Sequence, residues 1–183
     1  SYAQTTKRWV PAAGGAWTTA ANWSPSGVPA ANDDVIIPVN QTQPITAIPS
    51  ISLRKFIIRG NCQLEGANNN SMITVNDSFH IVSGITVSYG LTTSKFSITL
   101  ASASKGLIEG TFVQNSGTPS GTFNSNGALE IEPNGFISGT GSFVLNAGAS
   151  LLIGSPNGIA TGTTASGNIR VTGTRTFNVG ANY

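Results

Sequence analysis

Short apolar runs separated by glycine and asparagine fill most of this chain, and one group of them returns at a fixed spacing. The segment Pro133-Asn134-Gly135-Phe136-Ile137 recurs as Pro156-Asn157-Gly158-Ile159, 23 residues later. A fixed period in this range is typical of stacked repeats, and for short strands it favours a β-solenoid in which three strands and their corners form one coil. The 124 residues from Gly60 to Tyr183 would then form roughly five coils, each about 4.8 Å above the last.

Several of these runs alternate between apolar and polar residues. Leu129 and Ile131 alternate with Glu130 and Glu132, which places one set of side chains inward and the other toward solvent. Between residues 1 and 31, three prolines exclude a long helix and leave room only for a short helical turn near residues 18–22. We predict strands at 34–38, 51–59, 72–75, 79–82, 85–88, 96–100, 107–109, 111–114, 128–132, 142–145, 150–153, 168–171 and 175–179, with an extended connection at 44–49.

The main alternative is an antiparallel β-sandwich, because Asn-Gly pairs also form two-residue hairpins. Two features argue against the sandwich: the strands have only about three to five residues, and the Pro-Asn-Gly segment recurs after 23 residues. We therefore predict an all-β, right-handed parallel β-helix in one domain, 1–183, with a Trp-rich N-terminal cap at 1–31 and coils at 32–183. The C-terminal residues show no capping helix or charged strand, so we expect a fragment of a larger protein that continues beyond this end or self-associates there.

Composition excludes several function classes. Only 9% of the residues are charged, against about 25% in an average protein, so Ser, Thr, Asn and Gly must cover the surface. The basic residues are few and scattered, which argues against a nucleic-acid partner. No apolar stretch approaches the about 20 residues of a membrane span, and we expect no membrane insertion. The single cysteine, Cys62, is expected to be a small apolar strand residue.

Two stretches resemble a known group of proteins. The N-terminal stretch comprises Trp23–Pro29, Asp34–Pro38 and Phe56–Gly60; the C-terminal one comprises Gly141–Ala149, Ser155–Ile159 and Thr172–Asn178. The first resembles the opening of G8-type domains and of large secreted surface proteins from Bacteroidetes-type bacteria, and the second is similar to the parallel β-helix repeats of the same proteins. The resemblance implies a secreted or cell-surface location and an adhesin-like role, and it implies no catalytic residues.

The three tryptophans are the strongest candidates for a binding site. Trp17 and Trp23 would offer flat rings on which sugars stack, whereas the alternative is that Trp9, Trp17 and Trp23 pack together as the cap of the first coil. We expect the cap, and keep Trp17 and Trp23 as the candidate ligand-binding residues.

No catalytic or metal-binding constellation stands out. Glu130 and Glu132 would lie about 7 Å apart on one strand face, within the range of glycosidase carboxylate pairs, with Lys105 or Arg170 as the nearest possible base. A solubilising role is the simpler interpretation. Asp33 and Asp34 are expected to stabilise a turn, and His80 with Cys62 is too few ligands for zinc. We expect no metal and no cofactor.

These observations predict a non-catalytic extracellular structural and adhesion module of a larger surface protein. Ladders of Asn, Ser and Thr on a flat solenoid face can hydrogen-bond to sugars, so an extracellular polysaccharide or a host or surface glycan is the expected partner. The alternative, from a different class, is a polysaccharide-active β-helix enzyme, either a lyase or a hydrolase, or a fragment of one.

Overall fold

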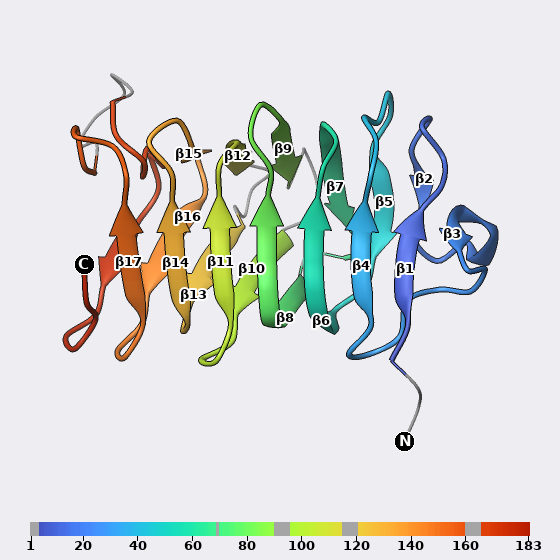
Figure 1. Ribbon diagram of the computed structural model, residues 1–183, viewed down its shortest axis with the longest axis horizontal. Coiled ribbons are helices and arrows are strands. Elements are labelled where there is room, and N and C mark those ends of the chain that lie inside the picture. The colour runs from blue at the N-terminus through green and yellow to red at the C-terminus, as the bar shows by residue number, and fades with distance from the viewer. Residues whose placement is uncertain (1–3, 69, 90–95, 115–120, 160–165) are drawn as a thin grey trace.

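The strands of this protein stack along one axis, and the stack has three sides that enclose a common core. The computed structural model describes residues 4–68, 70–89, 96–114, 121–159 and 166–183. Figure 1 shows the stack from its side, with the N-terminal strands at one end and the C-terminal strands at the other. We call the three sides face 1, face 2 and face 3, in the order in which the chain visits them within a coil. Faces 1 and 2 belong to one 12-stranded sheet, and face 3 is a 6-stranded sheet.

Each face is a ladder of strands contributed by successive coils. Face 1 contains the first halves of β6 (Ile51–Ile58) and β8 (Ser71–Ile81), then β10 (Phe96–Leu100), β13 (Thr122–Ser125), β16 (Ser142–Leu145) and β18 (Arg175–Phe177). Face 2 contains β1 (Thr6–Trp9), β4 (Asp34–Ile37), the second halves of β6 and β8, then β11 (Lys105–Ile108), β14 (Ala128–Ile131) and β17 (Ser150–Ile153). Face 3 contains β2 (Gly15–Ala16), β5 (Ile45–Ile48), β7 (Cys62–Gly66), β9 (Thr86–Tyr89), β12 (Thr111–Gln114) and β15 (Phe136–Gly139).

The pairing between neighbouring strands is parallel throughout the described residues, with one exception. Only β3 (Trp23–Ser24) runs antiparallel, beside β1. Parallel neighbours cannot be joined by tight hairpins, so the antiparallel sandwich is excluded. The predicted parallel β-solenoid of about five turns is confirmed.

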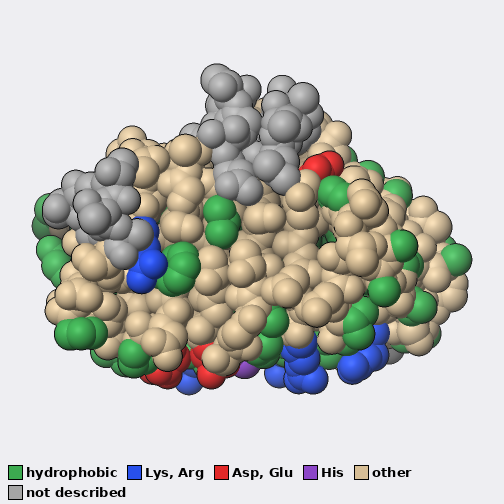
Figure 2. Space-filling view, turned by 90° about the horizontal axis from the view of Figure 1, so that it is seen from above, with side chains coloured by type: hydrophobic (Ala, Val, Ile, Leu, Met, Phe, Trp, Pro, Cys, Tyr) green, Lys and Arg blue, Asp and Glu red, His purple; other side chains and the backbone are tan. Residues whose placement is uncertain are grey.

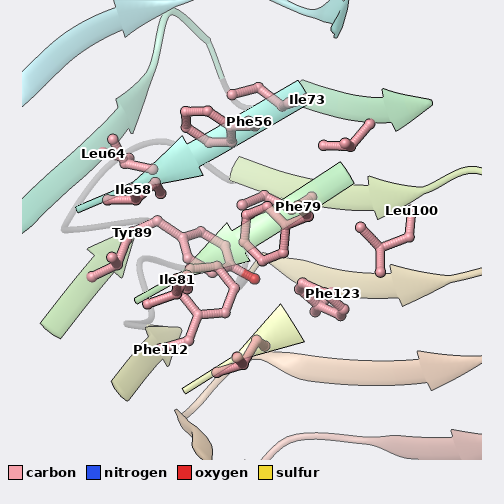
Figure 3. Packing of buried hydrophobic residues seen from close by; sticks show 14 of the residues in the cluster. Phe56, Ile58, Leu64, Ile73, Phe79, Ile81, Tyr89, Leu100, Phe112 and Phe123 are labelled. Carbon is pink, nitrogen blue, oxygen red and sulfur yellow. The ribbon is translucent and has the colours of Figure 1, made fainter. Parts of the chain in front are cut away.

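Alternation of side chains explains why these strands form a closed core. On face 2, Ile37, Ile58, Ile81, Ile108 and Ile131 occupy equivalent positions in successive coils, and each is fully buried. Aromatic rings fill the interior between the faces, as Figure 3 shows for Phe56, Phe79, Phe112 and Phe123. Burying a side chain of this size contributes about 1.5–3 kcal/mol, so a stack of like residues gives every coil a similar share of the core.

The strand boundaries differ from expectation in several places. The runs at 72–75 and 79–82 belong to one bent strand, β8, which pairs with β10 through its first half and with β11 through its second. The connection expected at 44–49 contains β5. Six other strands were not predicted: β1, β2, β3, β7, β13 and β15. Among the described residues, the strand expected at 168–171 does not form, and Ile169 makes only isolated β-bridges.

The second Pro-Asn-Gly corner does not lead to a regular coil. Ile169 bridges both Ile137 and Ile159, so the segment near Ile169 lies between the two copies of the repeat. Asn168 is buried and anchors it: its Nδ2 donates to the carbonyls of Glu132 and Gly135, and its Oδ1 accepts from the amide of Ser155. The sequence repeat at 23 residues is therefore a repeat of the corner only. After the second Pro-Asn-Gly corner, the chain contains an insertion before the next strand position.

The N-terminal segment closes one end of the stack. The 3₁₀ turn η1 (Ala20–Asn22) lies within the expected range 18–22 and leads into β3. Trp9, Trp17 and Trp23 are at most 2% exposed, and their rings meet edge to face. The Nζ of Lys7 donates to the carbonyls of Pro25 and Ser26 and holds the following loop against the first coil.

Candidate functional site

A polar groove lies at the edge of face 3. It encloses about 480 Å³ and lies between the loop that precedes β5 and the first residues of β7 and β9. Its lining is Gln41, Thr42, Gln43, Pro44, Asn61, Cys62, Gln63, Thr86 and Ser88. None of these side chains carries a formal charge at neutral pH, and the volume falls within the range of about 300–1,000 Å³ typical of ligand pockets.

The wall formed by Gln41 is fixed by the N-terminal cap. Its Oε1 accepts hydrogen bonds from the indole Nε1 of Trp9, at 3.0 Å, and from the amide of Gly14, at 3.2 Å. Its Nε2 donates to the carbonyl of Val39 at 2.8 Å. Because its donor and acceptor are both engaged within the protein, Gln41 shapes the groove and leaves binding to its neighbours.

Asn61 joins two successive coils at the floor of the groove. Its backbone amide donates to Oδ1 of Asn40, and its own Oδ1 accepts from the amide of Thr86 at 2.6 Å. Its carbonyl accepts from the amide of Gln41. These bonds hold the loop, β7 and β9 in a fixed relation.

The remaining polar groups are available to a ligand. Gln43, Thr42 and Thr86 are exposed, and Ser88 is half-buried. Within the described part of the chain, no hydrogen bond occupies the side chains of Gln43, Thr86 and Ser88, whereas the Nε2 of Gln63 donates to Glu65 at 2.7 Å. The groove thus presents amide and hydroxyl groups from adjacent coils, which can both donate to and accept from sugar hydroxyls.

Cys62 lies beneath this surface and takes no part in nucleophilic chemistry. Its side chain is 6% exposed, and burial raises the pKa of its thiol to about 12. A thiol with that pKa stays protonated at neutral pH, and only the thiolate is a nucleophile. Cys62 is a small apolar strand residue, as expected from the sequence.

The two candidate tryptophans lie inside the cap. Trp17 is fully buried and Trp23 is 2% exposed, with ring centroids 4.7 Å apart. The Nε1 of Trp23 donates to the carbonyl of Trp17. Since a sugar-stacking platform needs an exposed ring face, these two rings do not provide one in this arrangement; they pack as the cap.

The candidate catalytic carboxylates lie on face 2, apart from the polar groove. Glu130 shares a shallow hollow of about 230 Å³ with Lys105 and Leu152, while Glu132 follows the end of β14 and does not line this hollow. Arg170 lies elsewhere, over the ring of Phe136 at 3.8 Å. Coil stacking therefore brings Lys105 to the same hollow as Glu130 but leaves Glu132 outside it.

The other candidate residues have local partners. Asp33 is buried, and its carboxylate accepts from the amides of Thr5 and Ala30, which is the predicted turn role. Asp34 forms an ion pair with Arg54, and His80 lies 2.6 Å from Glu109. Among the described residues, no group of three or more His, Cys, Asp and Glu side chains could hold a metal ion.

Sequence reasoning did not find the polar groove. Its residues come from three separate segments, and only the coil register brings them together, for example Gln63 beside Ser88. The 25-residue separation of Asn61 and Thr86, close to the coil length, is the one signal that links two of these segments.

Comparison with known proteins does not add a relative to these observations. No family model, no curated protein and no solved structure matches this chain. Within the described residues, no helix is long and apolar enough to cross a membrane.

Proposed function

We propose that this chain is a non-catalytic structural and adhesion module of a larger secreted or surface-attached protein, and that its polar groove binds an uncharged stretch of polysaccharide. The observation that carries the proposal is the composition of the groove, with amide and hydroxyl groups from adjacent coils and no charged side chain. The extracellular setting is supported by the resemblance of the N-terminal and C-terminal stretches to bacterial surface proteins.

A rigid groove suits a weak, repeated contact with a polymer. The bonds of Gln41 and Asn61 fix the groove before a ligand arrives, so binding orders few protein side chains. Each hydrogen bond to a neutral sugar contributes about 0.5–1.5 kcal/mol, so a single groove should bind weakly. Adhesion would then depend on many copies on one surface acting together.

A glycan array followed by calorimetry tests this proposal. We expect binding to neutral polysaccharides, and a loss of at least about tenfold in affinity for the double variant Gln43→Ala/Thr86→Ala, which removes two free polar groups. The matched control is Ser52→Ala/Thr74→Ala on face 1, which should bind as the unmodified chain does. Absence of binding to every neutral glycan, or equal affinity of both double variants, would contradict the proposal.

The polysaccharide-active enzyme stays as a second candidate because Lys105 and Glu130 share one hollow. A base and an acid in contact with one sugar unit are the minimum for a lyase or hydrolase. Release of new reducing ends or unsaturated sugars from an array hit, abolished by Glu130→Gln, would favour the enzyme. Binding without product would favour the adhesion module.

A further inference from the structure

The outward side of face 2 has a segregated charge pattern. Its middle row of side chains runs, coil by coil, through Arg8, Ile36, Ile57, His80, Leu107, Glu130 and Leu152. The row beside it runs through Thr6, Asp34, Lys55, Ser78, Lys105, Ala128 and Ser150. In Figure 2 this face lies along the lower edge, with most basic side chains toward one end and acidic side chains toward the other.

The charges at the two ends of this face differ in how they are satisfied. Arg54 and Lys55 are paired with Asp34 and Asp77. By contrast, Arg8 at the N-terminal end and Arg59, directly after β6, are exposed and form no ion pair within the described part of the chain. The same is true of Glu130, which is exposed, and Glu132, which is half-buried, at the other end. Lys105, which shares a hollow with Glu130, is also exposed and forms no ion pair among the described residues. Face 2 therefore presents free positive charge at its N-terminal end, and free negative charge together with Lys105 toward the other end.

Apolar side chains lie between these charges. Ile57 and Leu107 are half-buried, and Leu152, which is 61% exposed, lies one coil beyond Glu130. A partner that fits this face needs the same alternation of apolar and charged groups, with the sign of the charge reversed along the stack. A uniformly acidic or basic partner would be attracted by one end and repelled by the other, whereas a second copy turned end for end has the required pattern.

We infer that face 2 is a homotypic docking surface, on which two copies of this chain pack face to face with their stacks antiparallel. The two-fold axis lies parallel to the strands, between β6 and β8. β1 then faces β14 of the second copy, β4 faces β11, and β6 faces β8.

This register places one pair of free charges in contact, and the contact occurs twice by symmetry: Arg8 faces Glu130 of the second copy. In the adjacent row Lys105 faces Asp34, whose side chain is 13% exposed and already paired with Arg54. Ile36 faces Leu107, but Ile36 is only 9% exposed and adds little contact area. Residues in one row keep their position along the strand when the stack is reversed, so each residue faces a residue of the same row. In these pairs no like charges face each other.

The size of the surface predicts a weak and salt-dependent dimer. Six strands at about 4.8 Å spacing and four residues of about 3.3 Å each form a patch near 29 by 13 Å. Such a patch is smaller than the about 800 Å² per partner of a standard interface, so charge pairing must supply specificity. Association of this kind would link neighbouring copies on one surface or on two opposed surfaces, in addition to any glycan binding.

Sedimentation velocity of the full 183-residue chain tests the inference. We expect a monomer–dimer equilibrium at low salt and at concentrations up to about 1 mM, weakened at least about tenfold in about 0.5 M salt. A chain that stays monomeric throughout this range at low salt overturns the inference.

Charge reversal provides the specific test. Arg8→Glu and Glu130→Arg should each weaken self-association at least about tenfold, because each places like charges at two symmetric contacts. An equimolar mixture of the two variants should form a heterodimer, since the introduced glutamate of one chain then faces the introduced arginine of the other. At the second contact of that heterodimer, the unmodified Arg8 and Glu130 still face each other. Singles that dimerise normally, or a mixture that stays monomeric, would overturn the inference.

Two controls keep these outcomes interpretable. Ser138→Glu adds a negative charge on face 3 and should leave the dimer unchanged. If Arg8→Glu fails to fold by circular dichroism, Lys105→Glu takes its place, because the introduced carboxylate would face Asp34 of the second copy. Normal dimerisation of a folded Lys105→Glu chain then counts against the inference.

Discussion

The first and last coils of this chain differ in how their outer sides are covered. At the N-terminal end three buried indoles pack edge to face, and the antiparallel β3 covers β1. At the C-terminal end β18 has three residues, all of them half-buried, and Val179 and Tyr183 are 98% and 78% exposed. Both ends make backbone hydrogen bonds to the coil beneath, so the difference lies in how much apolar bulk covers the last coil.

The comparison indicates which feature stabilises an end of the stack. A terminal coil has neighbours on one side only, and a large buried side chain replaces the missing coil. The aromatic ladder at the C-terminal end continues from Phe143 through Phe177 to Tyr183, with ring centroids 5.8 and 5.4 Å apart, but its outermost ring stays in solvent. We therefore expect the C-terminal coils of this chain to open at a lower free energy than the N-terminal coils.

Removal of one cap tryptophan should have the largest effect. Trp23→Ala deletes a ring that contacts both other indoles and is expected to lower the free energy of unfolding by about 3–5 kcal/mol. Phe177→Ala, the matched change at the other end, should cost about half as much, because Phe177 is already half-buried. Urea unfolding followed by circular dichroism measures both, and equal costs would contradict the proposed difference between the ends.

Thiol labelling compares the opening of the two ends directly. At pH 8, native Cys62 should react with iodoacetamide about a thousand times more slowly than an exposed thiol, because burial raises its pKa to about 12 from 9.0. Leu151 is 4% exposed near the other end. A Cys62→Ser/Leu151→Cys variant should be labelled at least about tenfold faster than Cys62, since its coil opens more readily.

The control for this comparison is Cys62→Ser/Thr86→Cys, which places a thiol at an exposed position beside the buried one and should react at the rate of a free thiol. The thiolate fraction also sets a pH dependence: labelling of native Cys62 should rise about tenfold per pH unit toward about 12. Rapid labelling at pH 8 would show that the N-terminal coils open as readily as an exposed loop.

The fold was predictable wherever inward residues are apolar. Runs such as Phe96–Leu100 alternate without interruption, and their strands appear where expected. β13 escaped prediction because Ser125 points inward beside Phe123, so its apolar alternation is too short to recognise. The groove was harder to predict than the strands. Gln43 and Thr86 line it together only because of the coil register, and sequence spacing does not fix that register when coils differ in length.

The irregular C-terminal coil depends on one buried amide. Asn168→Ala removes three hydrogen bonds and leaves the carbonyls of Glu132 and Gly135 and the amide of Ser155 without this partner. We expect a loss of about 2–3 kcal/mol in the free energy of unfolding, together with faster hydrogen exchange near Ile169. The control Asn157→Ala lies on an exposed corner of the same coil and should change the stability by less than about 0.5 kcal/mol.

Replacement of a buried amide between the two ends should give the smallest change in the free energy of unfolding, and this change should be stabilising. Gln114 is fully buried, and neither its Oε1 nor its Nε2 has a hydrogen-bond partner among the described residues. Because an unsatisfied buried amide costs free energy that an apolar group of similar shape does not, Gln114→Met should stabilise the chain by about 1 kcal/mol. Gln63→Met is the control, since Gln63 is half-buried and bonded to Glu65, and it should bring no gain. A loss of stability in Gln114→Met would show that the amide is satisfied in solution.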